Sequence, residues 1–211
     1  MTNKREVFGT VFIALGVVLI ALCCILVLHN AKEDLDAEYA VMNQLPALQQ
    51  AIEEHRKLSE TGTTDVATAD AEHVHTDVMT VAYIDDYGYI GYLSFPSLEL
   101  ELPVMDQWDK ARMKLAPCLY YGSLYTDDLV IAGHNYQSSF GQLKNISIGD
   151  EVLFTDMDGI VHTYTVEDVE ILNPTDVTEM VASGWNLSLY TCTYDGSQRL
   201  TVRCMENTAT Y

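Results

Sequence analysis

The run Ser188-Leu189-Tyr190-Thr191-Cys192 is the stretch of this chain that says most about its fold and chemistry. Its apolar and polar residues alternate as they do in a β-strand, where successive side chains point to opposite faces. A second run of the same kind follows closely: Gln198-Arg199-Leu200-Thr201-Val202. We therefore expect two neighbouring antiparallel strands joined by a short turn over residues 193–198.

Strand alternation also predicts where the cysteine points. Leu187 and Leu189 share one face of the first strand, and Cys192 belongs to the other face. Arg199 likewise lies opposite the aliphatic residues of its own strand. If the aliphatic faces line the core, Cys192 and Arg199 meet on the outer surface. Unreactive free cysteines are usually buried among apolar neighbours, so this placement favours a reactive thiol.

A histidine upstream completes a possible reactive set. His134 follows an apolar strand and Gly133, in a loop position typical of functional residues. A solvated surface histidine is the alternative for His134, and an ordinary surface arginine is the alternative for Arg199. Together with Cys192 they supply what acyl transfer through a thioester needs. The thiolate attacks a carbonyl, the imidazole moves protons, and the guanidinium holds the substrate or its developing oxyanion.

Short strands dominate the chain from about Val78 onward. The Asp158-Gly159 pair is a hairpin signal. We expect strands at residues 89–95, 98–102, 129–132, 151–155, 160–166, 166–172, 186–191 and 199–204. Many short strands with little helix over roughly 130 residues indicate an all-β domain built as a closed or nearly closed barrel.

The N-terminus has the pattern of a membrane anchor. Residues 8–28 contain no charged side chain, and about 20 apolar residues suffice to cross a bilayer as a helix. Lys4 and Arg5 precede the run and acidic residues follow it, which predicts a cytoplasmic N-terminus. A cleaved signal peptide is the alternative, but its apolar region is usually shorter. We expect a single-pass protein of the cell membrane with its barrel outside the cell.

The segment after the apolar run has the residue spacing of a helix. Residues 29–57 carry apolar side chains at helical intervals, and Pro46 predicts two helical pieces that meet near Leu45. Residues 58–77 are polar and read as a flexible linker. The expected organisation is a cytoplasmic tail at 1–7, an anchor at 8–28, a helical stalk and linker at 29–77, and the barrel at 78–211.

Charge and cysteine content exclude several classes of protein. The net charge is −20, because the first 28 residues carry +1 and the residues after the apolar run carry −21. So acidic a body is not expected to bind nucleic acid. Of five cysteines, Cys118, Cys192 and Cys204 lie beyond the apolar run, which does not resemble a disulfide scaffold or a zinc site. At least one of the three must lack an intramolecular disulfide partner.

No cofactor is expected, and the acidic residues do not predict a calcium site. The obvious oxygen ligands are the acidic side chains of Asp127, Asp128, Asp156 and Asp158. Calcium needs several converging oxygens, and we interpret these residues as solvated turns.

The two runs that contain Cys192 and Arg199 resemble the signature of sortases, the membrane-anchored cysteine transpeptidases of Gram-positive-type envelopes. The signature is a T-L-x-T-C strand followed by an arginine on the next strand, and here Ser188 replaces the first threonine. Further segments resemble the family in the family's order, from about residue 90 to residue 204: 91–96, 102–104, 130–135, 140–143 and 149–152.

The resemblance implies an eight-stranded sortase-type barrel and a two-step reaction. Cys192 would attack the Thr–Gly bond of an LPxTG-like sorting signal on a secreted protein, and an amine of a cell-wall precursor or a pilin would release the acyl group. His134 would act as general acid and base, and Arg199 would position the signal and stabilise the oxyanion. Asn135 and Thr191 are further substrate-binding candidates.

Other interpretations stay open. Pilin-polymerising sortases usually carry an Asp-Pro-aromatic lid motif and often a second span near the C-terminus. This chain has neither, which favours an anchoring enzyme with an open groove. A thiol hydrolase is a further alternative, because water and amine use the same thioacyl intermediate. A non-catalytic, membrane-tethered binding barrel would keep the fold and leave Cys192 idle.

Overall fold

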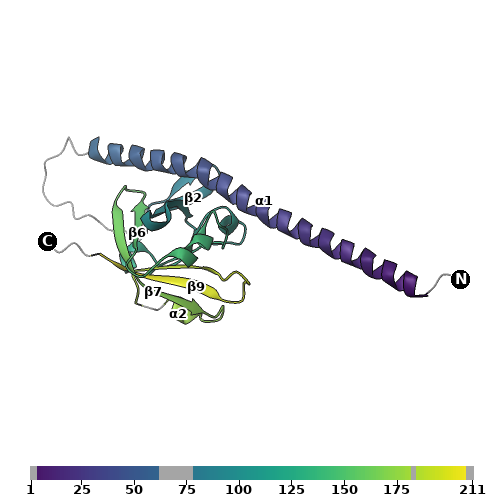
Figure 1. Ribbon diagram of the computed structural model, residues 1–211. Helices are drawn as coiled ribbons and strands as arrows, with labels where there is room; N and C mark the ends of the chain where they lie inside the picture. Colours follow the sequence, from purple (N-terminus) through teal and green to yellow (C-terminus); the bar gives the residue numbers. More distant parts are fainter. Residues whose placement is uncertain (1–3, 62–77, 182–183, 208–211) are drawn as a thin grey trace.

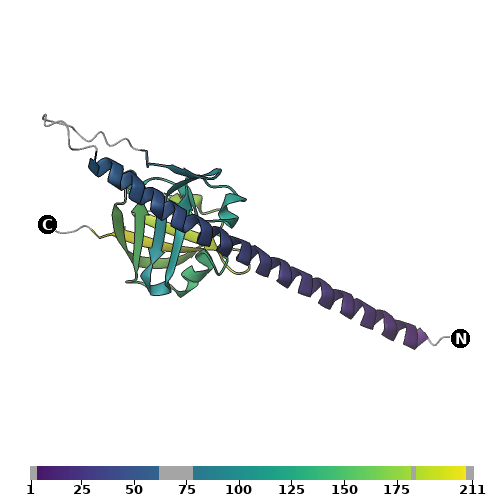
Figure 2. The same cartoon turned by 90° about the horizontal axis from the view of Figure 1, so that it is seen from above.

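A computed structural model describes residues 4–61, 78–181 and 184–207 (Figure 1). A β-barrel forms the body, and the long helix α1 (Lys4–Thr61) crosses it and projects far beyond it. Seen from above, the second half of α1 lies over the barrel and the first half extends away from it (Figure 2).

One sheet closes on itself to form the barrel. Its strand order is β1-β2-β3-β4-β5-β8-β9-β7-β6, and an added pairing of β2 with β6 closes the ring. In the described part of the chain β1 pairs with β2 alone, so eight strands, β2 to β9, form the barrel. The strands are β1 (Ala82–Ile84), β2 (Tyr87–Phe95), β3 (Leu100–Met105), β4 (Cys118–Tyr121), β5 (Leu129–Ala132), β6 (Glu151–Asp156), β7 (Val161–Leu172), β8 (Leu187–Cys192) and β9 (Arg199–Glu206).

The barrel interior is filled by the aliphatic faces of these strands. Leu187 and Leu189 of β8 and Val202 and Cys204 of β9 are fully buried in the main core, as strand alternation predicted. The expected all-β barrel is therefore confirmed. The strand order also brings the ends of β5, β8 and β9 together, and this end of the barrel carries the candidate site.

Some expected strand bounds were wrong. The strand expected at residues 98–102 begins two residues later, because Pro96–Leu98 forms the 3₁₀ turn η2 and Glu99 has a left-handed φ of 51°. The two strands expected over 160–172 are the single strand β7. The short strands β1 and β4 and the five-residue helix α2 (Val177–Val181) were not predicted.

Helix α1 is continuous, so the predicted break at Pro46 was wrong. A proline removes one backbone hydrogen bond, here the bond to the carbonyl of Met42. Both residues lie on the exposed side of the helix, where water can bond that carbonyl. Meanwhile Leu48 and Ile52, on the opposite side, are buried against the barrel and hold the helix in place.

The apolar and packed halves of α1 differ sharply. Side chains from Phe8 to Leu28 are exposed; the exposed fraction is 65% for Phe8 and 69% for Leu28. No residue in the most apolar stretch of the helix is buried. The helix is long and apolar enough to cross a membrane. Residues 58–61 of the expected linker are still helical, and its remainder, 62–77, lies outside the described residues.

Candidate active site

Cys192 and Arg199 face each other across two neighbouring strands. Cys192 ends β8 and Arg199 begins β9, and the antiparallel register pairs the two residues directly. Side chains opposite each other in such a pair have Cβ atoms about 5 Å apart. Both are half-buried, and their predicted meeting on the face away from the core is confirmed.

The turn that joins them is tightly bonded. The Thr193 amide donates to the Gln198 carbonyl at 3.0 Å, and Gly196 adopts the positive φ of 73° that the turn requires. Asp195 accepts hydrogen bonds from the Thr193 hydroxyl at 2.6 Å and the Ser197 hydroxyl at 2.7 Å, which lower the pKa of its carboxyl to about 2. The turn therefore fixes the relative position of the two strand ends.

The outer face of β8 and β9 is covered along its middle, where Ser188, Thr201 and Arg203 are buried. Arg203 points outward from β9, yet it is 1% exposed, because its guanidinium lies under α2. It donates to the Glu179 carbonyl at 2.7 Å, the Met180 carbonyl at 3.1 Å, the Ser188 hydroxyl at 2.8 Å and the Glu170 carboxylate at 2.7 Å. Ser188, the departure from the signature, is thus a hydrogen-bond acceptor beneath α2.

Arg199 donates to its own turn. Its Nη1 lies 3.0 Å from the Gln198 carbonyl and 3.5 Å from the Gly196 carbonyl. The side chain thereby turns toward the strand end instead of extending into solvent. The remaining guanidinium N–H groups can donate to a bound carbonyl or oxyanion beside Cys192.

His134 reaches the same end of the barrel through β5. Strands β5 and β8 are parallel, Ala132 is registered with Tyr190, and the Gly133 amide donates to the Tyr190 carbonyl at 3.0 Å. His134 and Cys192 each lie two residues beyond that registered pair. The ends of adjacent parallel strands lie at one edge of a sheet, so the topology places the histidine and the cysteine at the same end of the barrel.

The imidazole of His134 is half-buried and stacked. Its ring lies 3.7 Å from the Tyr136 ring, with 25° between the planes. Among the described residues, its Nδ1 is buried without a hydrogen-bond partner. Burial lowers the pKa of His134, while the negative charge of Glu33 acts in the opposite direction. Burial therefore favours the neutral form of this imidazole more than that of a solvated histidine.

Two glycines shape the loop that carries this histidine, residues 133–139, which we call the histidine loop. A Cβ at Gly133 would lie 2.4 Å from the Phe140 ring, and one at Gly141 would lie 2.5 Å from the Asn135 and Tyr136 carbonyls. The Gly141 amide donates to the Tyr136 carbonyl at 2.9 Å. The loop thus folds tightly onto the 3₁₀ segment η5 (Phe140–Asn145), which explains the glycine before His134.

Two cavities flank the cysteine and arginine. The first, of about 270 Å³, is lined by Cys192, Asn135, Thr191, Lys144 and others. The second, of about 210 Å³, is lined by Arg199 together with mostly aromatic and apolar side chains: Trp108, Tyr120, Val177, Met180 and Tyr190. His134 lines neither of these two cavities. A reacting bond placed between them would lie beside both Cys192 and Arg199.

Asn135 and Thr191 occupy supporting positions. The Asn135 amide donates to the Thr193 carbonyl at 3.3 Å, which ties the histidine loop to the segment that follows Cys192. Thr191 is 2% exposed, and within the described chain its hydroxyl has no hydrogen-bond partner. Both line the first cavity.

The other two cysteines of the barrel are buried. Cys118 and Cys204 are fully enclosed, and burial raises the pKa of each thiol to about 12. All five cysteines are free. Cys192 is consequently the partly exposed thiol of the barrel.

Two of the four acidic residues that could ligate calcium, Asp128 and Asp156, accept hydrogen bonds within their own turns. Asp128 accepts from the Ser123 amide and the Thr126 hydroxyl, and Asp156 accepts from the Asp158 and Ile160 amides. Within the described residues, no group of three or more histidine, cysteine, aspartate or glutamate side chains is arranged to hold a metal ion.

The family of the chain follows from the match between its sequence and known domains. The sequence model of the family described as "Sortase domain" matches residues 93–207. This match covers more than half of the chain and includes the whole site. The chain belongs to the sortase family. It is a sortase-family cysteine transpeptidase with the eight-stranded sortase-like barrel.

Solved sortase structures share this fold. Sortase C of Streptococcus pneumoniae has a TM-score of 0.54 and 19% identity, covering 80% of this chain and 96% of that one. Sortase A of Corynebacterium diphtheriae has a TM-score of 0.52 and 19% identity, covering 85% and 93%. Sortase C1 of Streptococcus suis has a TM-score of 0.51 and 24% identity, covering 58% and 74%. The comparison with curated proteins found no significant match.

The sequence reasoning missed several residues around the site of this sortase. Trp108 and Tyr120 line the second cavity, Tyr136 stacks on His134, and Glu33 on α1 contacts Tyr136. Trp108 is one of only two tryptophans, which was a usable signal. For Glu33 there was none, because an acidic residue on an expected stalk resembles any solvated carboxylate.

Proposed function

We propose that this sortase cleaves an LPxTG-like sorting signal and joins the acyl group to an amine of a cell-wall precursor. The observation that carries the proposal is the direct pairing of Cys192 with Arg199. The position of His134, two residues beyond the registered pair Ala132 and Tyr190, supports it.

The first step would make the thioester. Cys192 Sγ bonds to the threonine carbonyl carbon, the Thr–Gly C–N bond breaks, and protonated His134 gives a proton to the leaving glycine amine. Arg199 N–H groups stabilise the oxyanion that forms on the carbonyl oxygen.

The second step would break the thioester and transfer the acyl group to the amine. The incoming amine attacks the same carbonyl carbon while neutral His134 accepts its proton, and the Cys192 thiolate leaves. In the free enzyme the imidazole rests on Tyr136. Catalytic hydrogen bonds of this kind often tighten only when substrate binds.

The aromatic cavity beside Arg199 suits the apolar part of such a signal. Its aromatic rings meet edge to face: Trp108 and Tyr120 at 5.8 Å, and Tyr120 and Tyr190 at 5.3 Å. Aromatic-lined grooves bind extended, proline-containing peptides because both surfaces are rigid. The incoming amine would then reach the thioester on Cys192 through the first cavity, which lies on the cysteine side.

An open groove favours wall anchoring over pilin polymerisation. Among the described residues, none that precedes Trp108 lines either cavity, so no lid from that part of the chain covers Cys192. Pilin subunits supplied to the enzyme test this choice. Isopeptide-linked pilin multimers would contradict the anchoring assignment.

Membrane topology is the other part of the proposal. The apolar half of α1 would span the bilayer, with the N-terminus in the cytoplasm and the barrel outside the cell. A membrane-impermeant thiol reagent applied to intact cells should then label Cys192. Labelling only after lysis would contradict this orientation.

The decisive experiment uses the full chain in lipid nanodiscs. It is incubated with fluorescent LPxTG-type peptides, with and without triglycine, and mass spectrometry follows both the enzyme and the products. We expect an acyl adduct on Cys192 and an amide product that depends on triglycine. Cys192→Ala should abolish both, and Cys24→Ala, the same change in the apolar half of α1, should abolish neither.

Other results would contradict the proposal. An adduct that yields only hydrolysed peptide would indicate a thiol hydrolase. No adduct across a varied peptide library, with a folded and reduced protein, would indicate a non-catalytic binding barrel.

A further inference from the structure

The helix α1 contacts the histidine loop directly, just beyond its apolar half. Glu33 Oε2 accepts a hydrogen bond from the Tyr136 hydroxyl at 3.1 Å. Asp34 Oδ1 accepts from the Ser138 amide at 3.1 Å and from the Ser138 hydroxyl at 2.8 Å. Two consecutive helix residues thus bind two alternate residues of the loop that carries His134.

These contacts are connected to the imidazole. Tyr136, which donates to Glu33, is also the residue whose ring stacks on His134. Glu33 Oε1 is in turn paired with Lys114 Nζ at 2.6 Å, and Glu33 is only partly exposed. The carboxylate therefore has one oxygen on the tyrosine and the other on a lysine of the barrel, which restricts its position.

We propose that Glu33 and Tyr136 are positioning residues that hold His134 in place for proton transfer, so that the anchor helix completes the active site. The inference rests on the proposed role of His134. Tyr136 orients the imidazole by stacking, and Glu33 fixes the Tyr136 ring through its hydroxyl. Asp34 and Ser138 fix the end of the same loop.

The charged residues of these contacts also affect the pKa of His134. Three charged groups face His134 from the elements packed against it: Glu33 and Asp34 of α1, and Lys114 before β4. The two carboxylates raise the pKa of His134, and Lys114 lowers it, although burial is the largest effect and lowers it. Loss of Glu33 should therefore both loosen the ring and lower its pKa.

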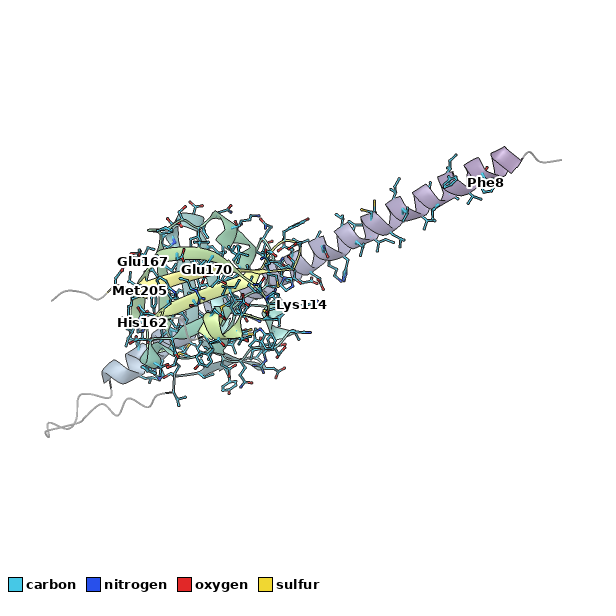
Figure 3. All side chains as sticks on the ribbon, turned by 90° about the horizontal axis from the view of Figure 1, so that it is seen from below. Phe8, Lys114, His162, Glu167, Glu170 and Met205 are labelled. Atoms are coloured by element: carbon cyan, nitrogen blue, oxygen red, sulfur yellow. The ribbon has the colours of Figure 1, made fainter. Side chains whose placement is uncertain are left out.

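The arrangement also places the active site beside the membrane. Glu33 lies five residues after Leu28, which at the rise of an α-helix is about 8 Å along its axis. Figure 3 shows Lys114, the partner of Glu33, at the end of the barrel from which the apolar part of α1 emerges toward Phe8. The histidine loop is thus held about one and a half helical turns from the expected bilayer, where membrane-tethered substrates arrive.

The test measures kcat, KM and their pH dependence with the full chain in nanodiscs, using the peptide and triglycine. The variants are Tyr136→Phe, which keeps the stacking ring, Glu33→Gln, and the double variant. The matched controls are Tyr83→Phe and Glu54→Gln, which make the same changes at exposed positions of β1 and α1. His134→Gln is the reference for loss of the imidazole, and thermal unfolding shows that each variant is folded.

We expect each single variant to lower kcat by about tenfold with KM unchanged, because a misplaced proton-transfer group slows chemistry without weakening binding. The double variant should lose no more than either single one, since both changes break the same hydrogen bond. Only Glu33→Gln and the double variant should also move the limb of the pH profile that reports His134 to lower pH.

Three results would overturn the inference. The first is an inactive His134→Gln with both single variants at the wild-type rate. The second is a double variant whose loss is the product of the single losses. The third, a His134→Gln with wild-type activity, would show instead that the proposed site itself is wrong.

Discussion

Three cysteines of the barrel illustrate how one side chain takes different chemistry from its surroundings. Cys118 and Cys204 lie among core residues, where burial raises the pKa of each thiol to about 12. Cys192 ends its strand on the opposite face and lines a cavity. Only a thiolate is a good nucleophile, so Cys118 and Cys204 are chemically inert in the folded protein.

This contrast predicts selective alkylation. With iodoacetamide at neutral pH, Cys192 should react on the order of a hundredfold faster than Cys118 or Cys204, whose thiolate fraction is very small. Peptide mapping by mass spectrometry measures each rate separately. Equal rates in the folded protein would contradict the burial argument, and equal rates in denaturant are expected.

Arg199 owes its expected role to geometry as well as charge. Its guanidinium already donates to the Gln198 carbonyl, and its other N–H groups can form a planar fork beside Cys192. Arg199→Lys keeps the charge and loses the fork. We expect kcat/KM to fall on the order of a hundredfold, as for loss of an oxyanion donor. A change below about threefold would show that charge alone suffices.

Packing by α1 makes the helix part of the folded domain. Leu48 is fully buried in a cluster with Tyr89, Met105 and Cys118, between α1 and the sheet that forms the barrel wall. A fragment that begins at Val78 would expose this cluster to water. The second half of α1 is thus needed for stability as well as for attachment.

Leu48→Ala tests this packing. Truncation of a buried leucine costs about 2–5 kcal/mol through lost burial and the cavity left behind. We expect the free energy of unfolding to fall by an amount in that range, measured by chemical denaturation in detergent. Leu58→Ala, at an exposed position of the same helix, should change it little.

Arg203 joins α2 to the barrel wall in a similar way. It is 1% exposed and donates to two backbone carbonyls of α2 and to Ser188 and Glu170. Because α2 contributes Val177 and Met180 to the aromatic cavity, Arg203 indirectly shapes the proposed binding site.

Arg203→Ala should therefore affect both stability and binding. Loss of one partner from a buried, charged network costs about 3–5 kcal/mol. We expect a lower melting temperature and, in the folded fraction, a higher KM for the peptide with a smaller effect on kcat. An unchanged melting temperature would show that α2 is held by other contacts.

The closed barrel brings distant segments together at the end opposite the site. His162 of β7 lies between Asp156 of β6, at 3.2 Å from Nε2, and Glu206 of β9, at 3.3 Å from Nδ1. Figure 3 shows His162 at the far end of the barrel from Lys114. The hydrogen bond to Asp156, followed by the one to Glu206, raises the pKa of His162 although burial opposes this.

The raised pKa predicts how stability depends on pH. Because the folded-state pKa exceeds the unfolded value of about 6.5, the stabilisation is complete below that pH and is lost as the pH rises through the folded value. His162→Gln should therefore cost more stability at about pH 5.5 than at about pH 8.5. Denaturation of both proteins at both pH values measures the difference, and a cost that grows with pH would contradict it.

Much of the fold was readable from local pattern. Strand alternation correctly assigned the core faces of β8 and β9, and the Asp158-Gly159 pair correctly predicted the β6–β7 hairpin. Such patterns are local, because alternation and turn chemistry depend on a few neighbouring residues. The break expected at Pro46 was wrong for the complementary reason: packing of Leu48 and Ile52 on the barrel outweighs the local effect of one proline.

The sequence alone determined the barrel class, the membrane-length apolar run, and the choice of Cys192, His134 and Arg199 as candidates. Only the tertiary structure decided that α1 packs on the barrel and that Glu33 reaches Tyr136, residues 103 positions apart. It also decided that Arg203 is buried under α2. Contacts of this kind depend on how whole elements pack, and no local periodicity in the chain records which faces will meet.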